Sequence, residues 1–575
     1  MGNDDPILSS IDTPLPQPRS VEEPPDVLKS FNAETIRQSL LKIFQQNGIT
    51  LDEDAVDYLL KKAFVNGTLV DSVIDHFYRT AESFNLVHIT LKKAIYILQN
   101  KRKNILIKVL DCFQDIHQYI WDSQNQKYTQ VDDRKKCLIP DSTVYYTTYQ
   151  HRYNRAVNRL KACPNIIWWS EIQAVQQLSL THGERLIVRP AQCAKGLTGD
   201  VSVFGTLCLK RKESLLDFEW MLEDGSQSYL LDISKWKPKD QLYLDSNMVV
   251  ITGDITTDND ILFVKNVSHL PFNEEFNIMK SDSVCQKKNI GNCATQLSTE
   301  SIRNCDWLVF GICQLDQSHV ISKIYNVLMR YDPSNLSGII LTGEFHSRGY
   351  NVFNQSNYVE GFRELFDNLQ LWISQWKNTM SNKVKLVLVP GKNDAGAKFL
   401  PKFPLLEAMV TYPYHDMLKD LDDYIEIILG SNPAWFHVMS EDDKNQVDKS
   451  LVVCRHDLIQ DIDIFKLALG VSFEQSLYPT STELCKAIPP LIIGQGHLYP
   501  LPYRSPHVLR IAIGYDFMLQ LSSLPNIVLL SDATVAYATF WQSTCWFCSP
   551  GQISENEYLY IDLGSNLVNV CNITY

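Results

Sequence analysis

The stretch LVLVPGKNDAGA runs from Leu386 to Ala397 and places a short apolar strand directly before a Pro-Gly turn. The turn ends on Asn393 and Asp394, whose side-chain oxygens could bind a metal ion or a substrate. In open α/β sheets the carboxyl ends of the strands meet along one edge, and binding sites are built there. This stretch therefore predicts a buried strand of an α/β domain with polar residues at its functional edge.

The sequence around this stretch alternates between strands and helices, as an α/β domain does. Apolar runs end in Gly, Asn, Asp or His, which places polar residues at the strand ends. Helices are predicted at 319–331 and 358–376. Strands are predicted at 307–312, 338–345, 383–391, 424–433, 450–458, 489–497 (PPLIIGQGH) and 526–533. We expect this domain to span residues 301–575.

The sequence before the α/β domain has a different pattern, with many short predicted strands and few helical repeats. Runs rich in Val, Ile, Leu and Phe are separated by Gly-Asp, Asp-Gly and Lys-Pro turns, which is typical of a small β-barrel of the OB type at 166–275. The runs are RLIVRPAQC (185–193), VSVFGTLCLK (201–210), FEWMLED (218–224), SYLLDIS (228–234), NMVVITGDI (247–255) and DILFVKNVSHL (260–270). OB barrels often bind single-stranded nucleic acid through exposed aromatic residues and a basic groove. Phe204, Phe218, Trp220 and Tyr229 lack a dense basic stripe, which favours a role in the core.

The N-terminal part predicts three further segments. Residues 1–30 carry six prolines and few large apolar groups, so we expect a disordered tail. Residues 31–105 contain four amphipathic stretches at helical spacing, which predict a small helical domain. Residues 106–165 are predicted to be connecting helices or a linker, and residues 276–300 a polar linker. The whole chain is thus a multidomain α+β protein.

Bulk properties exclude some classes of protein. A formal charge of −13 argues against non-specific DNA binding across the whole surface. No apolar run is long enough to span a membrane, and the N-terminus does not resemble a signal peptide. The 14 cysteines are scattered, which indicates reduced thiols inside a cell. Cys545 and Cys548 have the spacing of half a zinc site, but no second pair completes four ligands, and their neighbours Trp546 and Phe547 favour a buried strand.

The strand ends resemble the metal-binding motifs of calcineurin-like phosphoesterases, in which two ions stabilise the attacking and leaving oxygens. The family's Asp-x-His appears here as Ile312 and Gln314, and its Gly-Asp as Gly343-Glu344. Its Gly-Asn-His-Asp appears as Gly391-Lys392-Asn393-Asp394, and a histidine remains at His497. Ile312 cannot bind a metal, and Lys392 adds like charge beside one. The resemblance thus implies a degenerate phosphoesterase domain with no catalytic residue, metal or cofactor. Shifted ligands could be drawn from Asp316, His319, His346 and Asp394, but their spacing is not convincing.

Longer stretches resemble the B-subunit family of the DNA polymerases alpha, delta and epsilon, and its epsilon branch most closely. GQGHLYPLP (494–502) is the most specific of them. The others are RYNRAVNRL (152–160), LDQSHVISKIYNVL (315–328), IILTGEFHS (339–347), VPGKNDAGAKFLPKFPLLEA (389–408), SNPAWF (431–436), LVVCRHDL (451–458) and PNIVLLSDA (525–533). Two sites depart from the family: its Asn-Pro-Cys-Arg reads Asn432-Pro433-Ala434-Trp435, and its Asn-Pro-Gly-Ser-Phe is reduced to Ser549-Pro550-Gly551-Gln552.

This resemblance implies a non-catalytic scaffold in chromosomal DNA replication, located in the nucleus. It implies that the barrel and phosphoesterase domains bind the zinc-containing C-terminal domain of the catalytic subunit. It further implies that the N-terminal helical domain binds the replicative helicase assembly, including GINS, and that contact with DNA is mostly indirect. Two alternatives stay open: an active metal-dependent phosphoesterase with replaced ligands, and a stand-alone OB-fold single-strand binder.

Overall fold

The computed structural model divides the chain into two units, Met1–Arg102 and Lys103–Tyr575, which are considered separately. In the first unit it describes residues 41, 50–51, 56 and 88–89, and strands β1 (Thr50–Leu51) and β2 (His88–Ile89) pair in parallel. The predicted tail, nearly all of the predicted helical domain and the linker at 276–300 lie outside the described residues. In the second unit the described residues are 105–573 except 123–126, 131–141, 172–185, 198, 212–217, 226, 237–241, 257–259, 272–305, 378–379, 381–382, 441–442, 466–480, 501–510, 535 and 565.

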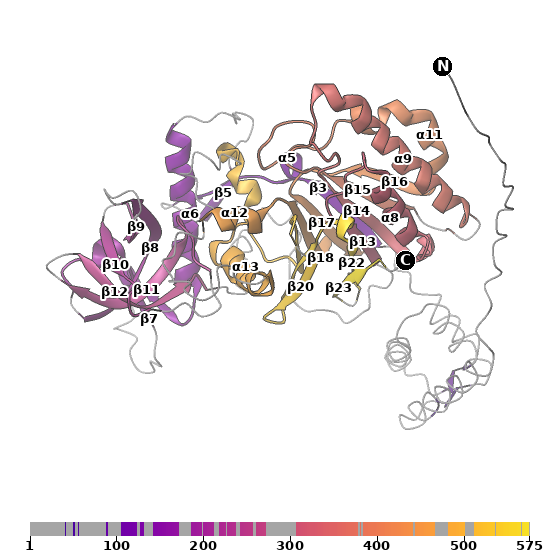
Figure 1. Cartoon of the computed structure of the whole chain (residues 1–575). Coiled ribbons are helices and arrows are strands. Elements are labelled where there is room, and N and C mark those ends of the chain that lie inside the picture. Colours follow the sequence, from indigo (N-terminus) through magenta and orange to yellow (C-terminus); the bar gives the residue numbers. More distant parts are fainter. Residues whose placement is uncertain are drawn as a thin grey trace, which may run out of the picture. The chain divides into compact units, whose positions relative to one another are not determined.

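The predicted run of short strands forms a closed five-stranded sheet, called the barrel below (Figure 1). Its strand order is β8-β9-β10-β12-β11, and β11 closes the ring by pairing with β8. The pair β10–β12 is parallel, and the other pairs of the ring are antiparallel. The strands are β8 (Gly199–Arg211), β9 (Phe218–Glu223), β10 (Ser228–Asp232), β11 (Met248–Thr256) and β12 (Ile261–His269), extended by β6 (Ile166–Trp168) and β7 (Leu186–Pro190). All six predicted strand runs are confirmed as strands.

The barrel is filled by its inward-facing side chains. Val203, Leu222, Tyr229, Val249 and Ile251 are fully buried in one apolar cluster. On β11 residues alternate between this cluster and a second one, because successive strand side chains point to opposite faces. The second cluster packs the outside of β8 and β11 against helix α6 (Ser142–Ala162).

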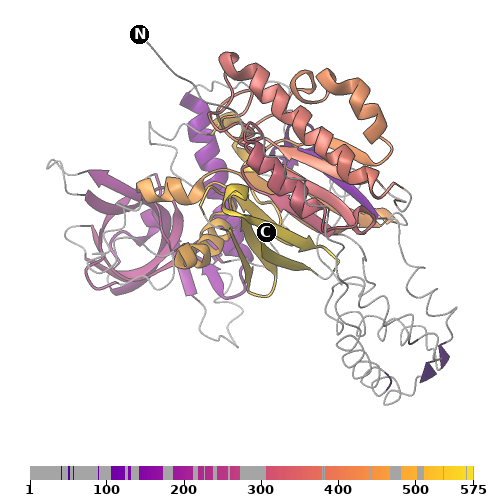
Figure 2. The same ribbon diagram turned by 45° about the vertical axis from the view of Figure 1, so that its right-hand side comes forward.

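The predicted α/β domain contains two six-stranded sheets. The first has the order β16-β15-β14-β13-β22-β23, with parallel pairing from β13 to β16. Helices α8 and α9 lie against it in both views (Figures 1 and 2). Its elements are β13 (Asp306–Phe310), α8 (Ser318–Leu328), β14 (Leu336–Thr342), α9 (Gln355–Ser374), β15 (Val384–Val389), α10 (Glu407–Val410), α11 (His415–Leu421), β16 (Ile425–Leu429), β22 (Glu557–Asp562) and β23 (Leu567–Asn572).

The second sheet has the order β20-β21-β19-β18-β17-β3. Its edge strand β3 (Ile105–Asp111) begins at the last residue of the predicted helical domain and otherwise lies in the segment predicted to be connecting helices or a linker, so a helix is wrong for these residues. The run predicted as a strand at 489–497 is also wrong, because Pro489 to Gln495 complete helix α13. The remaining elements are α5 (Cys112–Asp115), β4 (Tyr119–Asp122), β5 (Lys127–Gln130), β17 (Ala434–Ser440), β18 (Asp443–Arg455), α12 (Leu458–Phe465), α13 (Ser481–Gln495), β19 (Ile527–Ser531), β20 (Ala536–Trp541) and β21 (Cys545–Pro550).

The two sheets pack face to face. Trp307 and Val309 of β13 point toward the second sheet, and Leu308 and Phe310 point toward the helices. All four are fully buried, as the continuous apolar runs predict for strands covered on both faces. The other predicted strands of the domain, and both predicted helices, are confirmed. None of the helices among the described residues is both long and apolar enough to cross a membrane.

Candidate functional site

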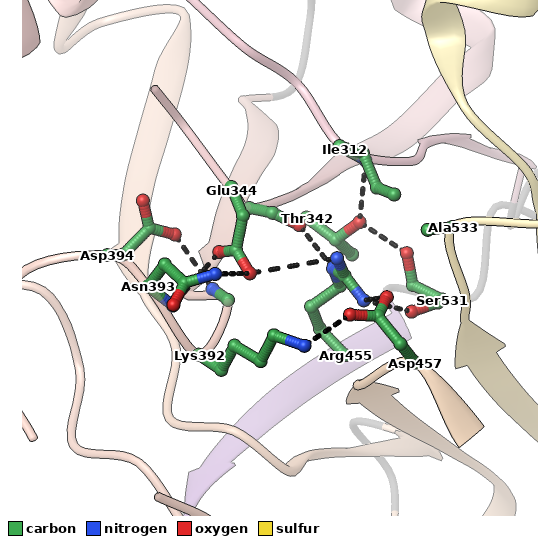
Figure 3. A network of polar contacts seen from close by, with 12 residues as sticks. Ile312, Thr342, Glu344, Lys392, Asn393, Asp394, Arg455, Asp457, Ser531 and Ala533 are labelled. Carbon is green, nitrogen blue, oxygen red and sulfur yellow. Dashed lines mark hydrogen bonds and ion pairs between the residues drawn. The ribbon is translucent and has the colours of Figure 1, made fainter. Parts of the chain in front are cut away.

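The carboxyl ends of β14, β15, β18 and β19 meet at one place in the α/β domain, and their polar residues form a continuous network (Figure 3). The hydroxyl oxygens of Thr342 and Ser531 are 2.6 Å apart and join the first sheet to the second. Arg455 Nε donates to the carbonyl of Gly343 over 2.7 Å. The network therefore lies where the sequence predicted a site, and both sheets contribute to it.

Asp394 is fully buried, and both of its carboxylate oxygens are occupied. Oδ1 accepts from the amide of Phe345 at 2.8 Å and from the Tyr358 hydroxyl at 3.3 Å, while Oδ2 accepts from the amide of Gly391 at 2.8 Å. Burial and the neighbouring charge of Glu344 raise the pKa of Asp394, against the effect of these backbone bonds. Asp394 thus fastens the loop after β15 to the loop after β14 and offers no free oxygen pair to a metal.

Glu344 lies against that same loop. Its carboxylate accepts from the amide and side chain of Asn393 at 3.3 and 3.4 Å. It also lies 3.7 Å from Arg455 Nη2. An added Cβ at Gly391 would lie 1.9 Å from Glu344 Oε2, so this position of the turn requires glycine.

Two cations lie among the carboxylates. Arg455 Nη1 donates to Asp457 Oδ1 at 2.6 Å and to the Ser531 carbonyl at 3.1 Å, and Lys392 Nζ donates to Asp457 Oδ2 at 2.7 Å. Burial would raise the pKa of Asp457, but Arg455 and Lys392 more than offset it and hold this pKa well below its usual range. Burial likewise would lower the pKa of Arg455, but Asp457 and Glu344 raise it above the usual value. The ion pairs are therefore fully charged.

A third basic side chain, that of Lys402, joins the network at the loop that follows β15. Lys402 is buried and donates to the backbone carbonyls of Asp394 and Lys392 at 2.6 and 3.1 Å. Three basic side chains thus lie among the carboxylates of Glu344, Asp394 and Asp457, and the buried Asp532 adds a fourth carboxylate whose charge acts on Arg455 and Asp457. A two-metal centre needs carboxylates left over to offset about four positive charges, and this arrangement leaves at most one.

Ile312 occupies the first position of the motif that resembles the phosphoesterase pattern. Ile312 is buried, with φ of 49°, a left-handed conformation that is rare for a β-branched residue. Its amide donates to Thr342 Oγ1 over 3.4 Å, and its carbonyl accepts from the amide of Gln314 over 3.0 Å. Backbone strain of this kind costs about 1–3 kcal/mol and persists where the surroundings enforce it.

The other candidate ligands do not converge on the network. Asp316 Oδ2 accepts from the Ser347 hydroxyl over 2.5 Å and lies 3.9 Å from His346 Nδ1. His346 Nδ1 accepts from the amide of Arg348 over 3.1 Å, and His319 is exposed on α8. Throughout the described part of the chain, no three His, Cys, Asp or Glu side chains are grouped so as to hold a metal ion.

His497 belongs to a different cluster. It follows α13, and its Nε2 lies 3.1 Å from Asp516 Oδ1 and 2.7 Å from Arg152 Nη2. Nδ1 accepts from the amide of Tyr499 over 3.0 Å, which leaves the ring proton on Nε2 facing Asp516. Burial and the charge of Arg152 lower the pKa of His497, so the ring is neutral.

The prediction of a buried strand at the Cys-x-x-Cys motif is confirmed. Both thiols are buried on β21, Cys545 in the cluster under α13 and Cys548 in the cluster between the sheets. Residues three apart on a strand point to opposite faces. The two thiols therefore do not face a common metal.

The sequence analysis did not single out five residues of the network: Thr342, Lys402, Arg455, Asp457 and Ser531. Arg455 and Asp457 directly follow the apolar run of β18, and Ser531 ends that of β19. Polar residues at strand ends were the signal that led to Asn393 and Asp394. The same signal applied to CRHDL (454–458) identifies the missed cation and its partner.

Comparisons with known proteins point to one family. A family model for the B-subunit of DNA polymerase alpha/epsilon matches residues 307–539. The DNA polymerase epsilon B-subunit of Eremothecium gossypii is 22% identical over 520 residues, which cover 77% of this chain and 74% of that protein. The B-subunit of the same polymerase from Candida glabrata is 21% identical over 445 residues, which cover 68% of this chain and 59% of that protein. Among solved structures, TT1561 of Thermus thermophilus is 12% identical and covers 47% of this chain and 99% of that one, with a TM-score of 0.24.

Proposed function

Because the chain belongs to the DNA polymerase alpha/epsilon B-subunit family, we propose that it is the non-catalytic B-subunit of a DNA polymerase epsilon complex that replicates chromosomal DNA. We place it in the nucleus, where such a complex acts. Its partner is the zinc-containing C-terminal domain of the catalytic subunit, and its N-terminal helical domain binds the replicative helicase assembly, including GINS.

One observation carries the non-catalytic part of this proposal. Arg455 and Lys392 supply the positive charge at the strand ends where a phosphoesterase would hold two metal ions. A fixed guanidinium neutralises carboxylates but cannot activate water or bind a leaving oxygen as a metal does. The α/β core is retained while Ile312, Gln314 and Lys392 depart from the ligand pattern, which supports a domain kept for its surface.

We further propose that the barrel is an OB fold. Its five strands close in the order β8-β9-β10-β12-β11. The parallel pair is β10 and β12, the third and fifth strands of the barrel along the chain. The single-strand-binder alternative receives less support at one of the barrel's exposed cations, because Lys265 pairs with Asp254 at 2.9 Å and lies 3.5 Å from Asp200. Such a lysine is already neutralised before it could contact a phosphate.

The proposal is tested by co-expressing the full chain with the C-terminal domain of the catalytic subunit. We expect a stable complex in size-exclusion chromatography and calorimetry, and better solubility than the chain alone. The matched control is the partner domain with its zinc-binding cysteines replaced by alanine, which should not form the complex. A monodisperse chain that ignores the partner and hydrolyses phosphodiesters with manganese would support the enzyme alternative instead.

A further inference from the structure

Helix α6 presents two different faces, and each contacts a different part of the second unit. Tyr149, Tyr153, Ala156 and Leu160 recur at helical spacing and pack against the barrel. The Tyr149 hydroxyl lies 2.9 Å from Thr206 Oγ1 on β8. This face joins the helix to the barrel through apolar contact.

The other face carries three arginines, Arg152, Arg155 and Arg159, which all reach the α/β domain. Arg152 binds both oxygens of Asp516, at 2.5 and 3.1 Å, which is the strong bidentate form of such a pair. Burial would raise the pKa of Asp516, but Arg152 and His497 hold it well below its usual range. Arg155 Nη2 donates to the Leu521 carbonyl at 3.0 Å.

Arg159 satisfies the end of helix α13. Nη1 donates to the carbonyl of Gly494 and Nη2 to that of Ile493, both at 2.8 Å. The last carbonyls of a helix have no partner within it and attract positive charge. Burial and the nearby Arg155 lower the pKa of Arg159 to about 9, so it keeps its charge at neutral pH.

The C-terminal end of α13 and the residues that follow it bind the barrel directly. Gln495 Nε2 donates to the carbonyl of Met248 at 2.9 Å and its Oε1 accepts from the Met248 amide at 2.8 Å, as the backbone of a neighbouring strand would. Asn247 Nδ2 donates to the Pro500 carbonyl at 3.1 Å. An added Cβ at Gly494 would lie 2.7 Å from the Cβ of His269 on β12, so only glycine permits this approach.

We infer that these groups form an interdomain clamp, made of Arg152, Arg159, Gln495, His497 and Asp516, which holds the barrel and the α/β domain in one fixed arrangement. The histidine that resembles a phosphoesterase ligand serves in this clamp as a positioning residue. The consequence for binding rests on the proposed function: the catalytic subunit meets a surface made of both domains, already arranged before binding. Such preorganisation strengthens binding because less freedom is lost on association.

The clamp is tested in the full chain with two spin labels on exposed residues, Lys210 of the barrel and Glu364 of α9. The labels are introduced as non-natural amino acids, because the chain has 14 cysteines of its own. We expect a narrow distance distribution in the unaltered chain. In the double variant Gln495→Met, Arg159→Met it should broaden at least twofold while both domains keep their circular dichroism. Gln375→Met with Arg363→Met, both exposed on α9 or its end, is the matched control and should change nothing.

A distribution as narrow in the double variant as in the unaltered chain would overturn the clamp. If the double variant does not fold, Gln495→Met alone decides: the Met248 amide should exchange with solvent at least tenfold faster, and unchanged exchange would overturn the inference. Affinity for the catalytic subunit's domain should fall about tenfold in the broadened variant. The unaltered chain could fail to bind that domain while the distance distribution between the labels still broadens in the double variant. In that case the proposed function is wrong and the inference of a clamp holds.

Discussion

Arg455 and Asp457 are 2.6 Å apart, joined through Nη1 and Oδ1, and both side chains are almost completely buried. A buried ion pair contributes little to stability by itself, because both charges are taken out of water. Removing one partner is costly, since the other charge stays buried without compensation. The strand ends are therefore held by charges that depend on one another.

Arg455→Met leaves Glu344 and Asp457 without their shared cation. We expect the free energy of unfolding to fall by about 3–5 kcal/mol, measured by urea denaturation. Lys419→Met is the control, because its pair with Asp416 is exposed to solvent and should contribute less than about 1 kcal/mol. Equal losses in the two variants would show that the buried network does not stabilise the domain.

Metal binding should fail even when the ligands of the phosphoesterase motif are introduced at Ile312 and Gln314. The chain carrying Ile312→Asp and Gln314→His keeps Arg455 and Lys392, which repel divalent cations. We expect no stoichiometric manganese in equilibrium dialysis for this variant or for the unaltered chain. Adding Lys392→His and Arg455→Met removes the two cations and should permit binding. Stoichiometric manganese with diesterase turnover in the unaltered chain would contradict the prediction.

The boundary of the N-terminal unit can be tested with two deletions. A chain lacking residues 1–102 should retain its thermal transition and bind the catalytic subunit's domain, but it should lose affinity for the helicase assembly. A chain lacking residues 1–115 also loses β3, which pairs with all seven residues of β17. It leaves the edge of β17 unpaired, so we expect a lower melting temperature and aggregation in light scattering. Equal behaviour of both truncations would mean that β3 is dispensable.

Stability should fall with rising pH because of Asp306. Its opposite residue across β13 and β22 is Asp562, and burial together with that charge raises the pKa of Asp306 to about 7. The unfolded chain releases this proton near pH 4. Between pH 4 and 7 the folded state therefore binds more protons, and the free energy of unfolding decreases as the pH rises.

Asp306→Asn removes this dependence, so its stability relative to the unaltered chain should increase with pH by up to about 1.4 kcal/mol per unit. Denaturation at pH 4.5, 6 and 7.5 measures the difference. Asp367→Asn, on the exposed side of α9, is the control and should run parallel to the unaltered chain. A parallel curve for Asp306→Asn as well would show that Asp306 is ionised normally in the fold.

The sequence predicted most strands and helices where apolar periodicity is local. The prediction of a strand at PPLIIGQGH (489–497) was wrong for two reasons. A short apolar run fits a strand or a buried helix equally, and the two prolines argued against a helix interior. The structure nevertheless continues α13 through Pro489 and Pro490, where buried Ile488, Leu491 and Ile492 pack in the core. Tertiary packing thus outweighs local preference at this position.

The sequence predicted the location of the site from residues at strand ends. It predicted only some of the residues that form the polar network. Asn393, Asp394 and Glu344 come from neighbouring loops of one sheet; their positions at strand ends and the resemblance to phosphoesterase motifs indicated them. Arg455 and Ser531 enter from the other sheet, and no spacing in the sequence relates them to Glu344. His497 was grouped with the site by motif, although Arg152, whose Nη2 lies 2.7 Å from His497 Nε2, is 345 residues earlier in the chain.

The position of β3 has a consequence for synthesis of the chain. The amide of Cys112, directly after this strand, donates to the hydroxyl of Ser431, just before the partner strand β17 and 319 residues later. At a translation rate of roughly 5–20 residues per second, the partner emerges on the order of 16–64 s after β3. Throughout that interval the run ILIKVLD has its backbone donors and apolar side chains uncovered. The nascent chain thus has a defined period in which a chaperone that shields extended apolar segments would determine its yield.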